Sequence, residues 1–294
     1  GALVPIQPRG TKRPLFCVHG GAGTILLFQP LARRLGPDQP LYGLQAVGLY
    51  GGEAPQRSVR AMAERYVREM RSVQPGGPYR VAGYCFGALV AYEMACQLKA
   101  ADEWTELLIS FNGPSPSYIA RYRPLFDREG ALRDEHGETV ERARRRKPSL
   151  GSDLRHQLVG DGTVAERLSR TGAEAYRRAR REAASRAQRA RLELYLSLGR
   201  PLPDSLRENS NFQRIAKRAQ DAYRPRPFPG GMLVVSGQGL YHSDDLGWSE
   251  HALGFVEAFL VPGRQPVPRR TMAEPWIGAV AERIGAALDA LEPS

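Results

Sequence analysis

Cysteine is scarce in this sequence. Of its 294 residues only Cys17, Cys85 and Cys96 are cysteines, and no two of them form a C-x-x-C pair. This odd, sparse count excludes a disulfide framework and is typical of a reducing compartment, so we expect a cytoplasmic protein. The five histidines show neither H-E-x-x-H nor zinc-finger spacing. The sequence therefore predicts no metal site.

Long apolar runs are absent as well. Runs such as 232–235 are far shorter than the roughly 20 residues that a helix needs to cross a membrane. No basic segment followed by an apolar one opens the sequence, so we expect neither a secretory signal nor a membrane partner. Hydrophobic residues make up 42% of the chain and charged residues 25%, which indicates a folded globular protein and excludes a disordered one.

The net charge of +11 is concentrated in the middle of the chain. Residues 114–226 hold 26 of the 42 basic and 15 of the 31 acidic residues, so the flanking parts are neutral. We expect a linker at 1–13, an α/β core formed by 14–113 and 227–294, and an Arg-rich helical insertion at 114–226. No platform of aromatic side chains, on which bases could stack, is interleaved with the arginines. We therefore expect most of them on a solvated helix face and no nucleic-acid partner.

Outside the insertion, short apolar runs alternate with helical patterns. Runs typical of buried strands occur at 15–18, 41–45, 79–82, 107–111, 231–236 and 255–261. Helices are indicated at 58–73, 88–98 and 274–291, and within the insertion at 173–198. This alternation predicts an α/β fold with a mostly parallel sheet and helices on both faces. The loops 19–23, 83–87, 112–114 and 237–247 then meet at the carboxyl edge of the sheet, where such sheets bind ligands.

One of these loops carries a chemical motif. The run Gly83-Tyr84-Cys85-Phe86-Gly87 joins a strand to a helix, which is the context of a G-x-nucleophile-x-G elbow with cysteine as the nucleophile. Gly83 and Gly87 lack the bulk that would keep strand and helix apart. The N–H of Phe86 is expected to form an oxyanion hole with a second N–H near Gly21 or Ala22, of which we choose Gly21. The simpler interpretation, a small buried cysteine in a glycine turn, is disfavoured by the matching loops around it.

Several segments together resemble a known family. The runs 15–21, 41–45 and 74–80, the elbow with its helix at 83–95, and Leu246-Gly247-Trp248 look like type I thioesterase domains, which end nonribosomal peptide and polyketide synthetases. The resemblance implies an α/β-hydrolase fold with a helical lid at 114–226. It also implies release of an acyl chain from a carrier-protein phosphopantetheine thioester through an acyl-enzyme on Cys85. The implied partner is an upstream carrier protein, which the basic lid could attract, and no cofactor of the domain's own is implied.

Two positions depart from the pattern of that family. Asn112 occupies the place of its aspartate, Gln265 that of its histidine, and no histidine follows His251. His251 is expected to be a surface or packing residue. His136 and His156 fall among the charges of the insertion and are expected to be solvated.

Three explanations remain open. The base has moved to His242, after the strand at 231–236, with Asn112, Asp244 or Asp245 orienting it. Alternatively Cys85 forms some thiolate without a base, because a helix N-terminus lowers the pKa of a thiol. In the third, the domain binds carrier protein without turnover. We favour the moved base, since the nucleophile and the elbow glycines are kept.

A cysteine nucleophile also bears on the product. Its acyl-enzyme would be a thioester, which is more reactive toward nitrogen and carbon nucleophiles than the oxoester of a serine. We therefore expect a thioesterase that acts as a cyclase ahead of simple hydrolysis. The resemblance implies a β-lactam or another small ring as the product, because cysteine-bearing release domains of that family are associated with strained rings.

Overall fold

A computed structural model describes residues 1–122 and 164–292 of the chain. The chain divides into two compact units, Gly1–Val140 with Gly199–Ser294, and Glu141–Leu198. In the second unit the described residues form helix α6 (Val164–Ser197), which agrees with the helix predicted at 173–198. The insertion predicted at 114–226 is therefore shared between the two units. No described helix is both long and apolar enough to cross a membrane.

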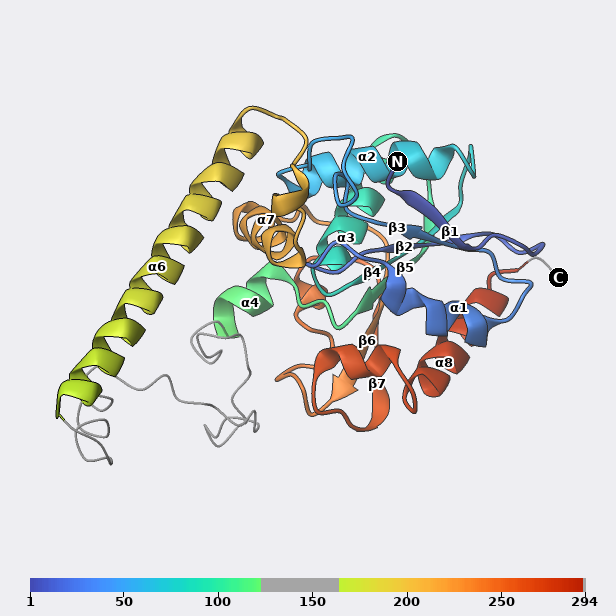
Figure 1. Ribbon diagram of the computed structural model, residues 1–294. Helices are drawn as coiled ribbons and strands as arrows, with labels where there is room; N and C mark the ends of the chain where they lie inside the picture. Colours follow the sequence, from blue (N-terminus) through green and yellow to red (C-terminus); the bar gives the residue numbers. More distant parts are fainter. Residues whose placement is uncertain (123–163, 293–294) are drawn as a thin grey trace. The chain divides into compact units, whose positions relative to one another are not determined.

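The first unit is built on one seven-stranded sheet with the order β1-β3-β2-β4-β5-β6-β7 (Figure 1). The strands are β1 (Leu3–Gln7), β2 (Leu15–Val18), β3 (Leu41–Leu44), β4 (Tyr79–Tyr84), β5 (Thr105–Phe111), β6 (Met232–Gln238) and β7 (Val256–Arg264). All neighbouring pairs are parallel except β1 with β3. The six strands predicted from the sequence are confirmed, and the carboxyl ends of β2, β4, β5 and β6 meet at one edge.

The prediction of a linker at 1–13 is wrong in part. Leu3–Gln7 forms β1, an edge strand that pairs antiparallel with β3, and the carboxylate of Glu69 accepts the N–H groups of Ala2 and Leu3, each at 2.6 Å. The strand is short and contains Pro5, and proline is tolerated in sheets mainly at edges, where its missing N–H is not needed. That is why the segment has the composition of a linker.

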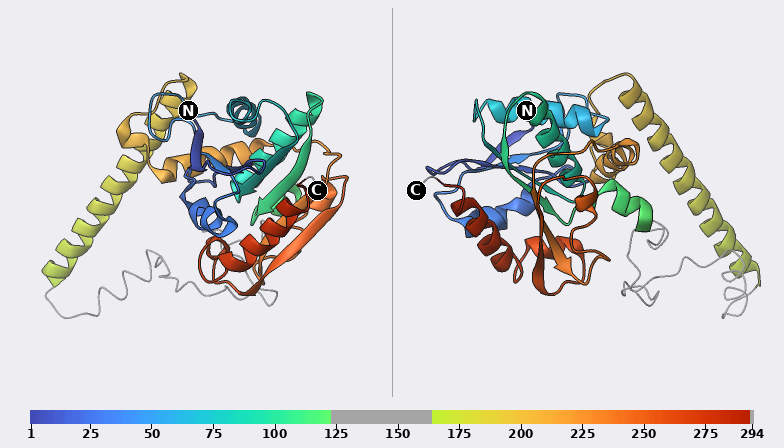
Figure 2. Two further views of the ribbon diagram at one scale, coloured as in Figure 1. Left: turned by 90° about the vertical axis from the view of Figure 1, so that its right-hand side faces the viewer. Right: turned by 180° about the vertical axis from the view of Figure 1, so that it is seen from behind.

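Helices cover both faces of the sheet (Figures 1 and 2). Helices α1 (Gln29–Leu35) and α8 (Ile277–Asp289) share one apolar core with the sheet residues of that face, among them Leu15, Ile109 and Val235. Helices α2 (Val59–Arg71) and α3 (Phe86–Ala100) pack on the other face and against each other. The start of α2 is capped by Ser58, whose side chain accepts the N–H of Ala61.

The remaining elements lie near the carboxyl edge of the sheet. Among the described residues they are α4 (Pro116–Tyr122), α7 (Asn209–Ala222) and the 3₁₀ helices η1 (Leu26–Phe28), η3 (Asp204–Leu206), η4 (Trp248–Glu250) and η5 (Pro268–Met272). The end of α7 is tied to α3 by Glu93, a buried carboxylate that accepts the Tyr223 hydroxyl at 2.8 Å and the Arg226 guanidinium at 3.2 Å. Through this link α7 is held close to the loop that follows β2.

Candidate functional site

The turn between β4 and α3 places Cys85 at the carboxyl edge of the sheet. Cys85 has φ 52° and ψ −117°, a backbone conformation that is strained for any residue except glycine, and it directly precedes the first turn of α3. Its N–H donates to the carbonyl of Phe111 at the end of β5, at 2.8 Å. A Cβ on Gly83 would overlap the backbone of Gly87, and a Cβ on Gly87 would overlap the carbonyl of His19. Both glycines are therefore required by close backbone contact.

The Cys85 thiol differs from the other two. Cys85 is exposed, whereas Cys17 and Cys96 are buried. The groups packed around the sulfur remove water and raise the pKa of the Cys85 thiol, while the N–H of Phe86, at the start of α3, acts in the opposite direction. Burial raises the pKa of Cys96 to about 12 and that of Cys17 still further. Only Cys85 combines access to solvent with a hydrogen-bond donor at a helix N-terminus.

The loop after β2 lies against this turn. A Cβ on Gly20 would approach the ring of Tyr84 to 3.0 Å, so the loop passes beside the residue that precedes Cys85. The loop is a tight turn closed by the bond from the Gly23 N–H to the Gly20 carbonyl at 2.9 Å. Among the described residues no hydrogen bond uses the N–H of Gly21. It remains available, as an oxyanion donor must be.

His19 shapes that loop. It is buried, with Nδ1 2.6 Å from the Gly20 carbonyl and Nε2 2.8 Å from the Tyr66 hydroxyl. Since a carbonyl only accepts, Nδ1 carries the proton and Nε2 accepts from Tyr66. Burial lowers the pKa of His19 to about 4. The ring is therefore neutral near pH 7, and both of its nitrogens are used in holding the loop.

Asn112 follows β5, adjacent to the elbow. Its φ is 47°, a left-handed conformation that asparagine tolerates better than most residues. The side-chain amide donates to the Thr271 hydroxyl at 2.5 Å and to the Pro268 carbonyl at 3.2 Å, and its oxygen accepts the N–H of Gly237 at 3.1 Å. The amide of Asn112 thus joins β5, β6 and η5, and it makes no described hydrogen bond to His242.

Gln265 follows β7 and is buried, with 1% of its surface exposed. Its amide nitrogen donates to the Val261 carbonyl at 3.2 Å, while its oxygen has no hydrogen-bond partner among the described residues. That oxygen would lie 2.7 Å from a Cβ on Gly237. Asn112 and Gln265 therefore both lie against Gly237, and both side chains are neutral.

His242 lies in the loop after β6, where the sequence placed it. Its backbone N–H donates to the Tyr118 hydroxyl at 2.8 Å, and its exposed ring stacks on that of Tyr122, with centroids 4.7 Å apart and planes at 18°. No hydrogen bond of the described residues joins this ring to Cys85. The assignment of His242 as the base stays a prediction.

The acids that were expected to orient His242 are placed differently. Asp245 accepts the Ser243 hydroxyl and the N–H groups of Gly247, at 3.0 Å, and Ser249, at 3.2 Å, so it caps the turn that opens η4. Although burial acts against it, these hydrogen bonds lower the pKa of Asp245 to about 2. Asp244 is exposed. The imidazole of His251 lies 2.9 Å from the Ser117 hydroxyl, whereas His136 and His156 lie outside the described residues.

Tyr241, the residue before His242, is a site residue that no motif in the sequence indicated. Its hydroxyl donates to the backbone carbonyl of Asn112 at 3.3 Å, and its ring meets the Tyr118 ring edge to face at 6.3 Å. Burial, followed by the charge of the Cys85 thiolate, raises the pKa of Tyr241 well above its usual value. The signal available in the sequence was its place in a loop already expected at the ligand-binding edge.

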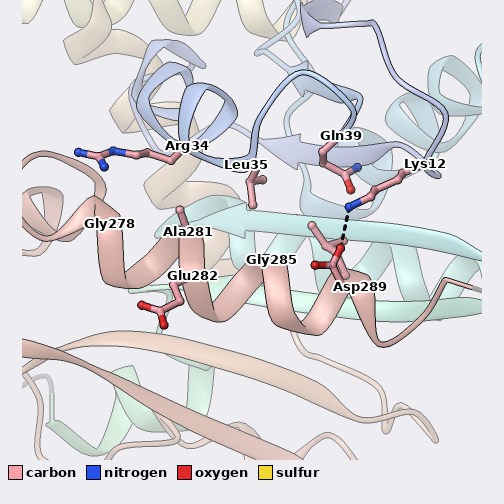
Figure 3. Close-up of a pocket in the computed structure, with 10 residues that line it drawn as sticks. Lys12, Arg34, Leu35, Gln39, Gly278, Ala281, Glu282, Gly285 and Asp289 are labelled. Atoms are coloured by element: carbon pink, nitrogen blue, oxygen red, sulfur yellow. Dashed lines mark hydrogen bonds and ion pairs between the residues drawn. The ribbon is translucent and has the colours of Figure 1, made fainter.

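A separate cavity of about 260 Å³ lies between α1 and α8, away from the elbow (Figure 3). Half of its lining on α8 is formed by the small residues Gly278, Ala281 and Gly285, and Lys12 and Asp289 form an ion pair of 2.7 Å at one end. None of the elbow residues lines it. Within the described ranges, no three His, Cys, Asp or Glu side chains are grouped so that they could hold a metal ion.

Comparison with known proteins places this site in a family. The family model described as a thioesterase domain matches residues 13–193. A nonribosomal peptide synthetase of Aspergillus terreus, apvA, is 37% identical over 164 residues, which is 55% of this chain and 18% of that protein. Malpinin synthetase of Mortierella alpina is 43% identical over 113 residues, 38% of this chain and 2% of that protein. The chain thus spans less than a fifth of the length of these relatives.

Solved structures agree in fold. The NocB thioesterase domain from the nocardicin cluster, in covalent complex with a fluorophosphonate nocardicin G analogue, has a TM-score of 0.59 and 22% identity, covering 98% of this chain and 100% of that one. The four-domain nonribosomal peptide synthetase AB3403, bound to AMP and glycine, has a TM-score of 0.60 and 20% identity, covering all of this chain and 20% of that one. The expected α/β-hydrolase fold is confirmed.

Proposed function

The chain belongs to the thioesterase domain family, and we propose that it releases an acyl chain from a carrier-protein phosphopantetheine thioester with Cys85 as the nucleophile. One observation supports the proposal: the exposed Cys85 thiol stands at a strained strand-to-helix turn beside the N–H of Phe86, and the neighbouring loop carries the Gly21 N–H, which no described hydrogen bond uses. The match to nonribosomal peptide synthetases supports the carrier-bound substrate.

The first step is an exchange between two thioesters. The Cys85 sulfur, as the thiolate, attacks the carbonyl carbon of the carrier-bound acyl group and forms a new carbon–sulfur bond. The negative charge moves to the carbonyl oxygen, where the Phe86 and Gly21 N–H groups stabilise it. The old carbon–sulfur bond then breaks, and phosphopantetheine leaves as a thiolate that takes a proton from solvent. Because the leaving group is as stable as the nucleophile, this step needs no general acid.

The second step does need a base. An amine or another nucleophile of the acyl chain attacks the Cys85 thioester, a bond to the carbonyl carbon forms, and the Cys85 sulfur leaves. We assign the removal of the proton from that nucleophile to His242, at the same edge of the sheet, whose ring nitrogens have no partner among the described hydrogen bonds. Reactivity of the thioester toward nitrogen favours ring closure over hydrolysis.

The carrier protein is the proposed partner. Helix α6 carries arginines that are all exposed, at 177, 178, 180, 181, 186, 189 and 191. A helix with this charge attracts an acidic protein surface or the phosphate of phosphopantetheine. No cofactor of the domain's own takes part in the proposed steps.

The test is detection of the acyl-enzyme. The intact chain is incubated with N-acetylcysteamine thioesters of short aminoacyl chains, and its mass is measured. A mass gain of one acyl group is expected, located on the Cys85 peptide and absent in Cys85→Ala. Cys96→Ala serves as the matched control and should retain the gain. An adduct that survives in Cys85→Ala, or no adduct with any thioester, would contradict the proposal.

The neutral pair Asn112 and Gln265 favours one alternative, a domain that binds carrier protein without turnover. A Cys85 adduct that never discharges would support it. Where product does form, its mass distinguishes ring closure from hydrolysis, since the ring is lighter than the hydrolysed acid by one water. Turnover of His242→Ala at the rate of the unmodified chain would exclude His242 as the base.

A further inference from the structure

We propose that the phenol of Tyr241 donates a hydrogen bond to the Cys85 sulfur and stabilises its thiolate, in the place that an imidazolium takes in a cysteine–histidine pair. The inference rests on the proposed function of Cys85 as a nucleophile. It assigns a role to a residue that lies beside the predicted base but has a different chemistry: a donor that stays protonated instead of a base that accepts a proton.

Three contacts place the Tyr241 hydroxyl near the turn that carries Cys85. Tyr241 donates to the carbonyl of Asn112 at 3.3 Å. The residue before Asn112, Phe111, accepts the N–H of Cys85 at 2.8 Å, and a Cβ on the residue after it, Gly113, would lie 2.6 Å from the Cys85 carbonyl. The carbonyl that holds the phenol therefore belongs to a residue flanked on both sides by contacts with Cys85.

The ring of Tyr241 is held from both sides. The N–H of Leu240 donates to the Gly237 carbonyl at 3.2 Å, and the N–H of His242 donates to the Tyr118 hydroxyl at 2.8 Å. The Tyr118 ring packs edge to face on the Tyr241 ring. With the backbone fixed before and after it, Tyr241 keeps one easy motion, rotation of its O–H about the C–O bond.

The strength of the two possible hydrogen bonds decides where that proton points. A distance of 3.3 Å is long for a hydroxyl donor, and the Asn112 carbonyl is a neutral acceptor, so the present bond is weak. A bond to a charged acceptor is roughly twice as strong as one between neutral groups. When the Cys85 thiol loses its proton to solvent, the sulfur becomes the better acceptor and the O–H turns toward it.

The surrounding charges keep the phenol protonated. Burial and the charges of Cys85, Tyr84 and Tyr118 all raise the pKa of Tyr241. Among the described residues, burial and then the charge of Cys85 also raise the pKa of Tyr84, and Arg269 opposes this rise. Tyr84 makes no described hydrogen bond through its hydroxyl, so it is the rival donor that an experiment must distinguish.

The test measures the ionisation of Cys85 directly. Iodoacetamide is reacted with the intact chain from pH 5 to pH 10, and alkylation of the Cys85 peptide is followed by mass spectrometry. In Tyr241→Phe we expect the apparent pKa of the thiol to rise by about one unit, which slows alkylation below that pKa about tenfold. Tyr84→Phe is the matched control and should leave the profile unchanged. Cys17 and Cys96 should stay unmodified in both variants, which shows that they are folded.

An unchanged profile in Tyr241→Phe, or a shift in Tyr84→Phe instead, would overturn the inference. Should Tyr241→Phe expose Cys17, a second substitution without a hydroxyl, Tyr241→Leu, is measured, and a normal Cys85 profile there has the same overturning force. Since alkylation needs no acyl substrate, the two proposals fail separately. A shifted profile in a chain that forms no acyl adduct would sustain the hydrogen bond and refute the proposed function.

Discussion

Replacing Asn112 by the aspartate of the family is expected to destabilise this fold. The side chain is 1% exposed, and its NH₂ group donates to Thr271 and Pro268 while its oxygen accepts from Gly237. Asp has the same shape and also tolerates the positive φ at this position, so Asn112→Asp changes hydrogen bonding and charge and little else. The two donated bonds are exchanged for a carboxylate oxygen that faces the Pro268 carbonyl and the Thr271 hydroxyl, whose own proton is directed at Pro268.

The size of the effect follows from those contacts. Each lost hydrogen bond is worth about 1 kcal/mol, and a buried charge facing the Pro268 carbonyl adds about 2 kcal/mol. The bond from the Gly237 N–H becomes charge-assisted and returns about 1 kcal/mol. The free energy of unfolding should therefore fall by about 3 kcal/mol at pH 7, a large part of the roughly 5–15 kcal/mol of a typical domain.

The loss should depend on pH in a defined direction. Burial raises the pKa of a carboxyl above its unfolded value of about 4, so the folded state binds the proton more tightly than the unfolded state. Stability of Asn112→Asp then falls as pH rises from about 4 through the raised folded pKa. Below pH 4 the neutral acid again has an O–H to donate, and the deficit shrinks.

Urea unfolding at several pH values, followed by tryptophan fluorescence, measures this. Asn112→Gly is the matched control, because it removes the same hydrogen bonds without charge or backbone strain, and its deficit should not vary with pH. The reasoning is refuted if Asn112→Asp is as stable as the parent chain at pH 8, or if its deficit, like that of the glycine variant, is the same at every pH.

Two further predictions concern the loops of the elbow. Gly87→Ala places a Cβ on the His19 carbonyl and should lower the midpoint of thermal unfolding or prevent folding. In the control Gly76→Ala nothing lies within 4 Å of the added Cβ, so the midpoint should stay unchanged. An unchanged midpoint in Gly87→Ala would contradict the elbow geometry. His19 has a folded pKa of about 4 against 6.5 in the unfolded chain. Its neutral burial therefore stabilises the fold fully above pH 6.5, and about 3 kcal/mol is lost as pH falls toward 4. In His19→Gln that part of the pH slope, read from urea midpoints, should disappear, and an unaltered slope would exclude His19 as its source.

Most of the sheet could be predicted from the sequence because its central strands are buried on both faces. Runs such as 15–18 and 232–235 are continuously apolar, and the turn residues after them mark where each strand ends. Strand β1 could not be found in this way. It lies at the edge, and only its pairing with β3 makes it a strand, an interaction between segments more than thirty residues apart.

The residues of the site also differ in how far the local sequence predicts their positions. Cys85, Phe86, Gly83 and Gly87 are neighbours in the sequence, so a local motif places them correctly relative to one another. The orientation of His242 depends on Tyr122, and the position of Tyr241 depends on Asn112, both more than a hundred residues away. The path of the loop after β6 decides where these two adjacent side chains point, and no spacing rule encodes that path.

Two residues, Asn112 and Gln265, stand where the resembled family has an aspartate and a histidine, and these two substitutions are physically linked. Asn112 and Gln265 both lie against Gly237 in a buried site, and an aspartate is stable in such a place only beside a cation. Without a histidine at 265, an acid at 112 would be an uncompensated charge, so a neutral amide at both positions is the stable pairing. A serine nucleophile could not use this neutral pair, because its hydroxyl must give up a proton to a base. A thiol ionises far more readily than a hydroxyl, and the Phe86 N–H and the Tyr241 phenol can stabilise the thiolate, so the acylation step needs no base at position 112 or 265.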